Sequence, residues 1–552
     1  MENNTYGKKM GKKKAIVIGA GLGGLVCANR LAISGLDVTL LEQHDKVGGL
    51  SQAWEKKPRL NNGERIAATF ELTQVVSGFL EGEKWYKLYE DLGVEWDRIG
   101  PFVPAPRFGV LRTADGEESE IFNDFEDNRN YLLEQFPEES DGVNKFFGIL
   151  DRMHEEYYSC SGWKKKLETF VEPRIKRHPF FKKPLYLLTK PTFVKLRNHT
   201  YQDILNNCFK GEDIKAHLSM LRNYVGISPS KASGLLMSIL LLSFWKSGGP
   251  LAPAESSFQV MHDELARVLV EKHGGDVRLL SKVKDIHVEN NAVKGVKVVQ
   301  RGKKEEYRLE ADYVIVAGDA KRALLPLRDH LPKKYVNMLE GMVMSGSLMG
   351  VHAIVEKDLF GIEERMACAT NVLISSKEAL SVADGTNFPE HYAISVAVPT
   401  VLRPEAKLVR DLDGKPLSKY HIVDLAMDSL PYENWDKLRK EDIKAYRAKK
   451  DAYAQEMIRI TEDMLIPGLS DAVRYTDVYT AKTCERFCNV TEGAVYAFEQ
   501  TPGQFIPNRP TACTPIKGLY LTGSSILAGG VPPAISAGKM TADALLEDEA
   551  NS

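Results

Sequence analysis

Residues 15–42 read AIVIGAGLGGLVCANRLAISGLDVTLLE, and this stretch decides the fold of the N-terminal part of the chain. The short apolar run Ala15–Ile18 is typical of a buried parallel strand, and a second such run covers Val38–Leu41. The residues between them have the composition of a helix that Gly35 would end. The stretch therefore predicts a strand, a helix and a second parallel strand.

Three glycines stand at the first turn in the order G-x-G-x-x-G. Gly19 permits a tight turn, Gly21 lets a pyrophosphate approach the backbone, and Gly24 lets the helix pack close to the sheet. The helix N-terminus offers free N–H groups and partial positive charge to phosphates. Glu42 ends the second strand, where a carboxylate accepts hydrogen bonds from a ribose diol. The alternative is a glycine-rich turn without a ligand. The residues predicted to bind an adenine dinucleotide are Gly19, Ala20, Gly21, Leu22, Gly23, Gly24, Glu42 and Gln43.

Two further segments favour FAD over NAD. Residues 47–52 read VGGLSQ, and a G-G-x-x-S segment just past the ribose acid is typical of FAD enzymes. Residues 518–546 predict a strand, a glycine turn and a helix that opens near Pro532, whose N-terminus would face the flavin or the pyrophosphate. The alternative for this second segment is an ordinary C-terminal strand and helix. The additional residues predicted to contact FAD are Gly48, Gly49, Leu50, Ser51, Gly523, Ser524, Gly530 and Val531.

The chain resembles the phytoene desaturase, carotenoid isomerase and retinol saturase family of FAD enzymes over nearly its whole length. The matching segments are KKKAIVIGAGLGGL, VGGLSQ, GGDVRLLSKVKDIHVENNAVKGVKVV followed by ADYVIVAGD, EGAVYAFEQTP, RPTACTPIKGLYLTG and GGVPPAISAG. The resemblance implies an FAD cofactor and an apolar, carotenoid-like or other lipid substrate. It further implies desaturation, saturation or double-bond isomerisation, and a backbone contact from Val283 to the adenine.

The implied fold class is α/β. A discontinuous, Rossmann-like FAD-binding domain of the glutathione-reductase and amine-oxidase type would carry an α+β substrate or lid domain. The expected ranges are 12–78, 250–330 and 474–552 for the FAD domain, and 79–249 and 331–473 for the substrate domain. Within these, residues 79–249 predict mainly helices with few strands, and residues 437–465 predict one polar helix.

Composition suits a large globular enzyme, with 43% hydrophobic and 27% charged residues. The net charge of -2 gives no general attraction to nucleic acid. Seven cysteines are scattered along the chain, which indicates reduced thiols and a cytoplasmic protein. Cys484 and Cys488 lack further ligands at zinc spacing, so no metal site is expected.

Two segments bear on membranes. The longest apolar stretch, residues 234–245, is shorter than the roughly 20 residues needed to span a bilayer, so it predicts a buried helix or a pocket wall. Residues 164–197 carry eleven Lys or Arg and two Glu, interleaved with aromatic and aliphatic residues. This pattern suits docking on the anionic inner face of a membrane. The alternative is a solvent-exposed helical insertion whose apolar side packs on the rest of the protein.

The chemistry is less determined than the cofactor. Since one dinucleotide motif is visible, electrons would pass to or from a diffusing quinone, oxygen or reduced carrier. No acid or base is assigned; Tyr496, Glu499 and Gln500 would line the pocket or form a buried hydrogen-bond network, and Glu499→Gln would lower turnover in the first case. Two other functions remain open. One is a flavin amine or amino-acid oxidase. The other is a flavin-free, prenyl-binding carrier of the GDP-dissociation-inhibitor type, against which the intact glycines and Glu42 argue.

Overall fold

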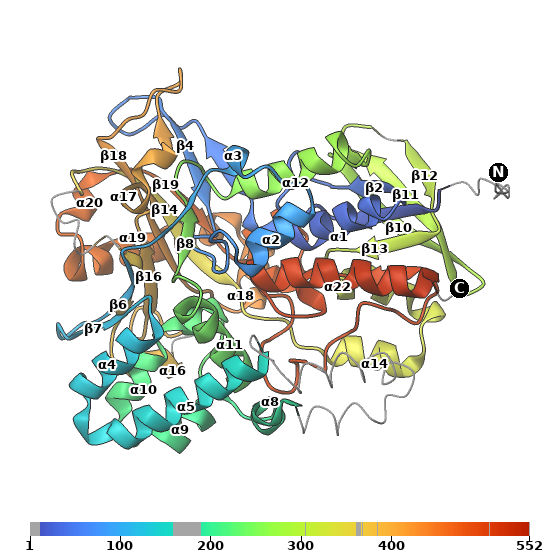
Figure 1. Cartoon of the computed structure of the whole chain (residues 1–552). Helices are drawn as coiled ribbons and strands as arrows, with labels where there is room; N and C mark the ends of the chain where they lie inside the picture. Colours follow the sequence, from blue (N-terminus) through green and yellow to red (C-terminus); the bar gives the residue numbers. More distant parts are fainter. Residues whose placement is uncertain are drawn as a thin grey trace.

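A computed structural model gives the fold, and Figure 1 shows it as a cartoon. The structure describes residues 12–157, 189–303, 305–359, 366, 368–382, 385–506 and 508–550. Most of the segment predicted to dock on a membrane, residues 164–197, therefore lies outside the described residues. Only residues 189–197 of it are described.

A parallel five-stranded sheet forms the centre of the first unit. Its strands, in spatial order, are β20 (Leu519–Leu521), β13 (Tyr313–Val316), β1 (Lys14–Ile18), β2 (Asp37–Leu41) and β9 (Asp276–Arg278). Helix α1 (Leu22–Ile33) connects β1 to β2, as predicted, and packs against α12 (Gln259–Glu271) and α22 (Val531–Ala550). The expected Rossmann-like strand–helix–strand unit is confirmed.

Both faces of this sheet are covered, which explains its continuous apolar strands. Successive residues of β1 enter different cores: Ala15 and Val17 pack with the helices, whereas Ile16 packs on the opposite side. That opposite side is covered by an antiparallel sheet of β10 (Ser281–Glu289), β11 (Ala292–Gln300) and β12 (Glu306–Glu310). The β10–β11 turn places Asn290 and Asn291 at positive φ, which asparagine tolerates better than most residues.

The second unit is built on a mixed seven-stranded sheet. Its strands, in spatial order, are β19 (Val473–Tyr479), β14 (Leu348–Glu356), β18 (Tyr420–Asp428), β16 (Ala393–Ala397), β15 (Cys368–Ile374), β6 (Arg107–Thr113) and β7 (Glu118–Ile121). Strand β14 alternates: Met349, Val351 and Ala353 enter one core, while Leu348 and His352 line a cavity on the other face. The sheet thus forms one wall of that cavity.

The described part of residues 79–249 is mainly helical, as predicted, and its few strands include β6 and β7. Strand β6 is almost wholly buried against β15, so tertiary pairing decides its conformation. Strand β19 pairs with β14, so the expected boundary at 474 falls inside this sheet, and we propose that the last FAD segment begins after Tyr479. The single helix predicted over 437–465 is two helices, α18 (Tyr432–Glu441) and α19 (Ile443–Met464), because Asp442 caps the second.

A group of helices lies in the lower part of Figure 1. These are α4 (Phe125–Gln135), α5 (Ser140–Tyr157), α8 (Pro191–Leu196), α9 (Tyr201–Cys208), α10 (Glu212–Leu218) and α11 (Gly234–Trp245). Two of them, α8 and α11, contribute residues to the cavity wall. Helix α11 covers the apolar stretch 234–245 and is buried, as predicted.

Shorter elements complete the chain. The strands are β3 (Ala53–Lys56), β4 (Ala67–Glu71), β5 (Phe102–Pro104), β8 (Leu251–Pro253) and β17 (Val409–Arg410). The helices are α2 (Lys84–Asp91), α3 (Trp96–Ile99), α13 (Ala320–Leu324), α14 (Lys333–Gly341), α16 (Ala379–Val382), α17 (Pro399–Leu402), α20 (Leu469–Ala472) and α21 (Ala481–Cys488).

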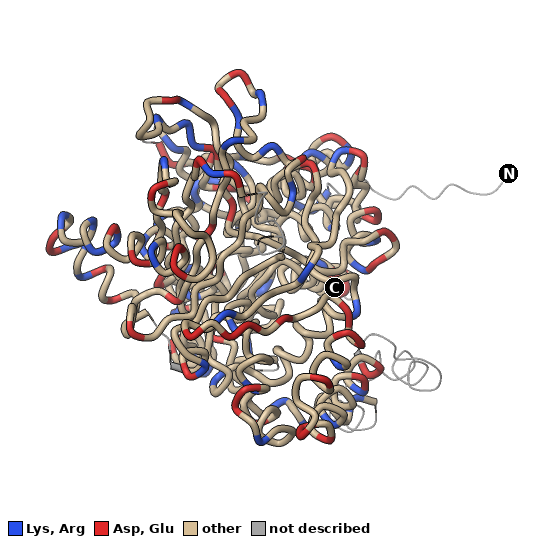
Figure 2. The backbone as a smooth tube through the Cα atoms, turned by 90° about the vertical axis from the view of Figure 1, so that its left-hand side faces the viewer, with Lys and Arg blue, Asp and Glu red and all other residues tan. Residues whose placement is uncertain are grey.

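Charged residues of both signs are interspersed along the outer turns and loops of the chain (Figure 2). Among the described residues, no helix combines the length and the apolar composition that a membrane crossing requires.

Candidate functional site

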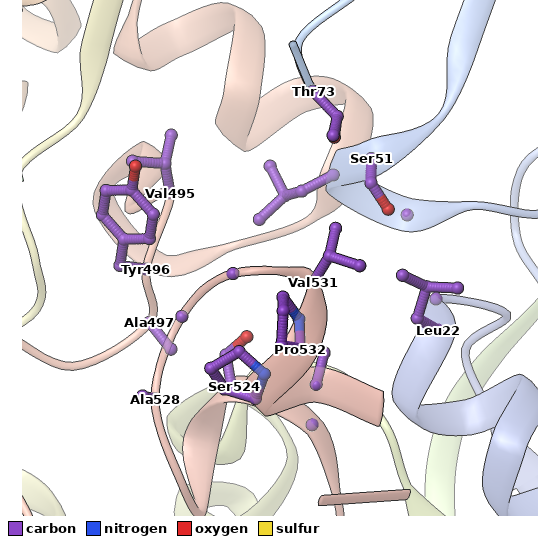
Figure 3. A pocket seen from close by; sticks show the side chains of 18 of the residues that line it. Leu22, Ser51, Thr73, Val495, Tyr496, Ala497, Ser524, Ala528, Val531 and Pro532 are labelled. Atoms are coloured by element: carbon purple, nitrogen blue, oxygen red, sulfur yellow. The ribbon is translucent and has the colours of Figure 1, made fainter. Parts of the chain in front are cut away.

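A cavity of about 1060 Å³ runs from the glycine turn after β1 to helix α11 and the seven-stranded sheet. Its wall combines residues from both ends of the chain: Leu22 and Ser51 face Tyr496, Ser524 and Val531 across it (Figure 3). Ligand pockets usually measure roughly 300–1,000 Å³. The cavity therefore has room for a large cofactor and a second ligand.

The glycine turn divides into positions that face the cavity and positions that pack. Gly21 lines the cavity, and a Cβ placed on it would meet nothing within 4 Å. A Cβ on Gly23 would stand 2.9 Å from Cα of Gly523, and one on Gly24 would overlap the carbonyl oxygen of Gly19. Gly21 thus leaves backbone open to a ligand, whereas Gly24 permits close helix–strand packing.

The second glycine segment lies directly against the first. The N–H of Gly48 donates to the carbonyl oxygen of Ala20 at 2.8 Å. A Cβ on Gly49, whose φ is +61°, would stand 3.2 Å from Cα of Gly21. The hydroxyl of Ser51 lies 2.8 Å from Nε2 of His262, and Nδ1 of that ring lies 3.0 Å from the carbonyl oxygen of Phe258. These contacts hold the two glycine segments as one cradle.

Glu42 is held at the edge of this cradle with 8% of its surface exposed. Its Oε2 accepts from the N–H of Ala20 and its Oε1 accepts from the N–H of His44, each at 2.8 Å. Each carboxylate oxygen keeps a second lone pair for a ribose hydroxyl. The residues present therefore fit the adenosine half of FAD.

Most of the predicted FAD contacts line the cavity. They are Gly19, Gly21, Leu22, Gly23, Glu42, Gln43, Gly48, Gly49, Leu50, Ser51, Val283, Gly523, Ser524, Gly530 and Val531. Two predicted residues, Ala20 and Gly24, are not part of the lining. Ala20 acts through its N–H on Glu42, and Gly24 packs within the fold.

In the late segment EGAVYAFEQTP, residues 492–502, some residues line the cavity and others do not. Tyr496 and Gln500 line the cavity, whereas Glu499 does not. The hydroxyl of Tyr496 donates to the carbonyl oxygen of Asn223 at 3.1 Å, and burial raises its pKa. Gln500 accepts from the buried guanidinium of Arg509 at 2.9 Å. The buried network expected for Gln500 is present, and Glu499 is not a pocket residue.

The structure adds polar residues to the cavity wall that the sequence did not single out. His352 and Asp424 stand opposite each other on β14 and β18, with Nδ1 and Oδ1 2.6 Å apart. Glu71, also in the wall, forms a buried ion pair with Arg403. One feature could have pointed to His352: it is a polar residue inside the otherwise apolar run of residues 348–355.

One part of the cavity wall, called the apolar arm below, is rich in apolar side chains, and the same segments also place Lys190, Arg197, Ser243 and Ser247 in the wall. Helix α11 supplies the largest group of its side chains, and the described end of the basic segment, helix α8, supplies two more. Its lining residues are Leu235, Leu236, Ile239, Leu240, Phe244, Phe193, Val194, Phe505 and Ile506. Among the described residues, no cluster of His, Cys, Asp or Glu could hold a metal ion.

Comparison with known proteins places the fold and the cofactor. The family model "Flavin containing amine oxidoreductase" matches residues 22–430. The chain is 25% identical to prolycopene isomerase from Daucus carota, over 97% of this chain and 80% of that protein. It is 24% identical to a lycopene-forming phytoene desaturase from a Paracoccus strain, over 98% of each. The predicted resemblance to phytoene desaturases and carotenoid isomerases is confirmed.

Solved structures share the fold at low sequence identity. A putrescine oxidase triple mutant superimposes with a TM-score of 0.59 at 16% identity, covering 98% of this chain and 99% of that one. An oxidoreductase from Methanosarcina mazei gives 0.57 at 16% identity, covering 97% and 100%. The family match spans most of the chain, and the glycine cradle and Glu42 fit the cofactor. The chain therefore belongs to the flavin-containing amine oxidoreductase family and is an FAD-dependent oxidoreductase.

Proposed function

We propose that this enzyme acts on carbon–carbon bonds of an apolar isoprenoid, carotenoid-like or other lipid substrate, by desaturation, saturation or double-bond isomerisation. The apolar arm carries this proposal, because it opens into the same cavity as the glycine cradle. An arm lined by leucine, isoleucine, valine and phenylalanine gains free energy by excluding water from a hydrocarbon chain. The names of the relatives, prolycopene isomerase and phytoene desaturase, support the same substrate class.

The residues of the cradle would hold the cofactor. Glu42 would accept hydrogen bonds from the ribose, Gly21 would let the pyrophosphate approach, and Val283 would contact the adenine. FAD supplies hydride transfer when bound. The protein contributes orientation and a dry site, since hydride transfer needs the reacting carbon about 3–3.5 Å from its partner atom.

A diffusing partner would carry the electrons, as either a quinone, oxygen or a reduced carrier. The parallel sheet holds one dinucleotide cradle, that of β1, α1 and β2. Net oxidation or reduction of a lipid would therefore need a second substrate that enters and leaves.

Amine oxidation is the alternative for the same fold. An ammonium substrate would need a carboxylate in the pocket, and two of those in the wall are already engaged. Glu71 is paired with Arg403, while Asp424 contacts His352 and the side-chain amide of Gln74. This arrangement favours the lipid substrate. The intact cradle argues likewise against a flavin-free prenyl carrier.

The test begins with the absorbance spectrum of the purified protein and extraction of its FAD. The holoenzyme is then incubated with phytoene, prolycopene and putrescine, aerobically with a quinone and anaerobically after reduction. Conversion of a polyene, followed by chromatography, with no oxidation of putrescine, is the expected result. Oxidation of putrescine alone would establish the amine oxidase. Absence of flavin after reconstitution with excess FAD would favour the carrier.

We also propose that the basic segment 164–197 docks on an anionic membrane so that a lipid enters the apolar arm. Phe193 and Val194, near its end, line that arm, and so does Ile506, which is 42% exposed. Co-sedimentation with phosphatidylserine vesicles at low salt, lost in high salt, is the expected result. A protein that stays in the supernatant at low salt would contradict this proposal.

A further inference from the structure

His352, in the cavity wall, combines a ring held by aromatic neighbours, a carboxylate partner and a buried nitrogen without a hydrogen-bond partner among the described residues. The residue is 2% exposed, on the cavity face of β14. Its ring stacks on Phe70 and on Tyr479, each with centroids 5.3 Å away, and meets the edge of Trp54 at 5.1 Å. These three contacts fix the plane of the imidazole.

Asp424 determines how the two ring nitrogens differ. Its Oδ1 lies 2.6 Å from Nδ1 of His352, and its Oδ2 accepts from Nε2 of Gln74 at 2.9 Å. A carboxylate opposite Nδ1 holds the proton on that nitrogen, which leaves the lone pair on Nε2.

Nε2 of His352 is the unpaired atom. It is buried, and it has no hydrogen-bond partner among the residues that the structure describes. A buried polar atom without a partner is destabilising, so such atoms in native proteins call for an explanation. Proton transfer to or from a bound substrate supplies one.

We propose that His352 is the proton-transfer residue of this cavity and that Asp424 and Gln74 are its positioning residues. The inference rests on the proposed action on carbon–carbon bonds and deepens it. In desaturation, Nε2 would take a proton from one carbon, and the adjacent carbon would give up a hydride, for which bound FAD would be the acceptor. The electrons of the C–H bond that loses the proton form the new double bond, and His352 passes the proton to water. Saturation is the reverse: His352 delivers the proton and reduced FAD the hydride.

The decisive variant is His352→Gln, which keeps a polar side chain but cannot exchange a proton. We expect it to bind FAD with the wild-type spectrum and to convert phytoene or prolycopene about 100-fold more slowly or worse. His421→Gln is the matched control, because His421 is also 2% exposed, lies on the neighbouring strand β18 and is not in the cavity wall. The control should retain turnover.

Two further measurements distinguish proton transfer by His352 from a purely structural role of this residue. Imidazole added to His352→Gly should restore turnover at least about tenfold, as expected for a missing acid–base group. With anaerobically reduced FAD in D2O, the polyene formed by the wild-type enzyme should carry solvent deuterium at the carbon that His352 protonates, and His352→Gln should lose this label. Asp424→Asn should lower turnover while FAD stays bound.

The outcomes separate this inference from the proposed function. The inference alone would be overturned if His352→Gln showed turnover and deuterium uptake at about the wild-type level. It would also be overturned if the wild type converted a polyene but imidazole did not rescue His352→Gly. A wild-type holoenzyme that neither binds nor converts either polyene would overturn the proposed function and this inference with it.

Discussion

Gly23, in the first helical turn of α1, lies against Gly523, in the turn after the last strand of the parallel sheet. A Cβ on Gly23 would stand 2.9 Å from Cα and 3.1 Å from N of Gly523. Gly23 can therefore carry no side chain without a shift of backbone. An N-terminal and a C-terminal segment of the chain are in contact here, and both glycines line the cavity.

This contact predicts that alanine at Gly23 and alanine at Gly21 affect different properties, the stability of the apoprotein and the affinity for FAD. Gly23→Ala should destabilise the apoprotein by about 1–3 kcal/mol, because the added methyl group overlaps backbone. Gly21→Ala is the matched control, since its Cβ meets nothing within 4 Å and its φ of -71° suits alanine. Gly21→Ala should keep the apoprotein stability and weaken FAD affinity at least about tenfold by blocking the pyrophosphate. Thermal unfolding of the apoprotein and fluorescence titration with FAD measure the two effects; equal unfolding temperatures for Gly23→Ala and wild type would contradict the packing argument.

Glu42→Gln should weaken FAD binding without unfolding the protein. The amide can no longer accept from both N–H groups and also offer charge to the ribose hydroxyls. Hydrogen bonds to charged groups contribute about 1.5–3 kcal/mol, so we expect the dissociation constant to rise by about 10-fold or more. Asp37→Asn, at the exposed start of the same strand, is the control. An unchanged FAD titration in Glu42→Gln would remove the ribose contact from the site.

Arg403→Met should lower the free energy of unfolding by about 3–5 kcal/mol, because it leaves the carboxylate of Glu71 buried without its partner. The same pair links separate segments: Nη1 of Arg403 donates to the carbonyl oxygen of Ser256, and Glu71 accepts from the N–H of Phe258, each at 2.9 Å. The double variant with Glu71→Gln should recover part of the loss. A double-mutant cycle in urea measures this; additive single effects would show that the pair is not coupled.

Acid should weaken the cradle through His262. Burial lowers the pKa of this ring from 6.5 to about 4, so the folded protein favours the neutral form. The unfolded chain binds the proton first, and stability is therefore full above pH 6.5 and falls as the pH drops toward 4. One pKa unit corresponds to about 1.4 kcal/mol.

His262→Gln should flatten part of this pH dependence of unfolding. It should not remove all of it, because burial lowers the pKa of His217 to about 4 as well. Since His262 contacts Ser51, FAD should also dissociate from the wild type in the same pH window. His217→Gln, outside the cavity, should alter stability without altering FAD release. Retention of FAD at pH 4 by the wild type would contradict the role given to His262.

Glu499→Gln should leave turnover unchanged. The sequence suggested Glu499 as a pocket residue, but the side chain is not in the cavity wall. Gln500→Leu, in contrast, should destabilise the protein, because it removes an acceptor from the buried guanidinium of Arg509. Steady-state kinetics with a polyene and thermal unfolding separate the two variants, and a slow Glu499→Gln enzyme would restore the original expectation.

The local pattern of residues 15–42 was sufficient to predict β1, α1 and β2, since each element depends mainly on its own apolar residues and glycines. The same holds for α11, whose stretch is apolar throughout. The pattern did not locate β6 within its mainly helical range, and it missed the break at Asp442. A strand that becomes buried by pairing with β15, and a cap that divides one polar run, both depend on neighbours that the local composition does not show.

The sequence was sufficient to predict FAD, because the G-x-G-x-x-G turn, the ribose acid and the G-G-x-x-S segment after it are short motifs whose geometry is local. Which side chains share the cavity depends on the tertiary structure. His352 and Asp424 lie 72 residues apart and become partners because β14 and β18 pair in register. Strand pairing brings together residues that no spacing in the chain relates. The candidate proton-transfer pair could therefore be identified only from the tertiary structure.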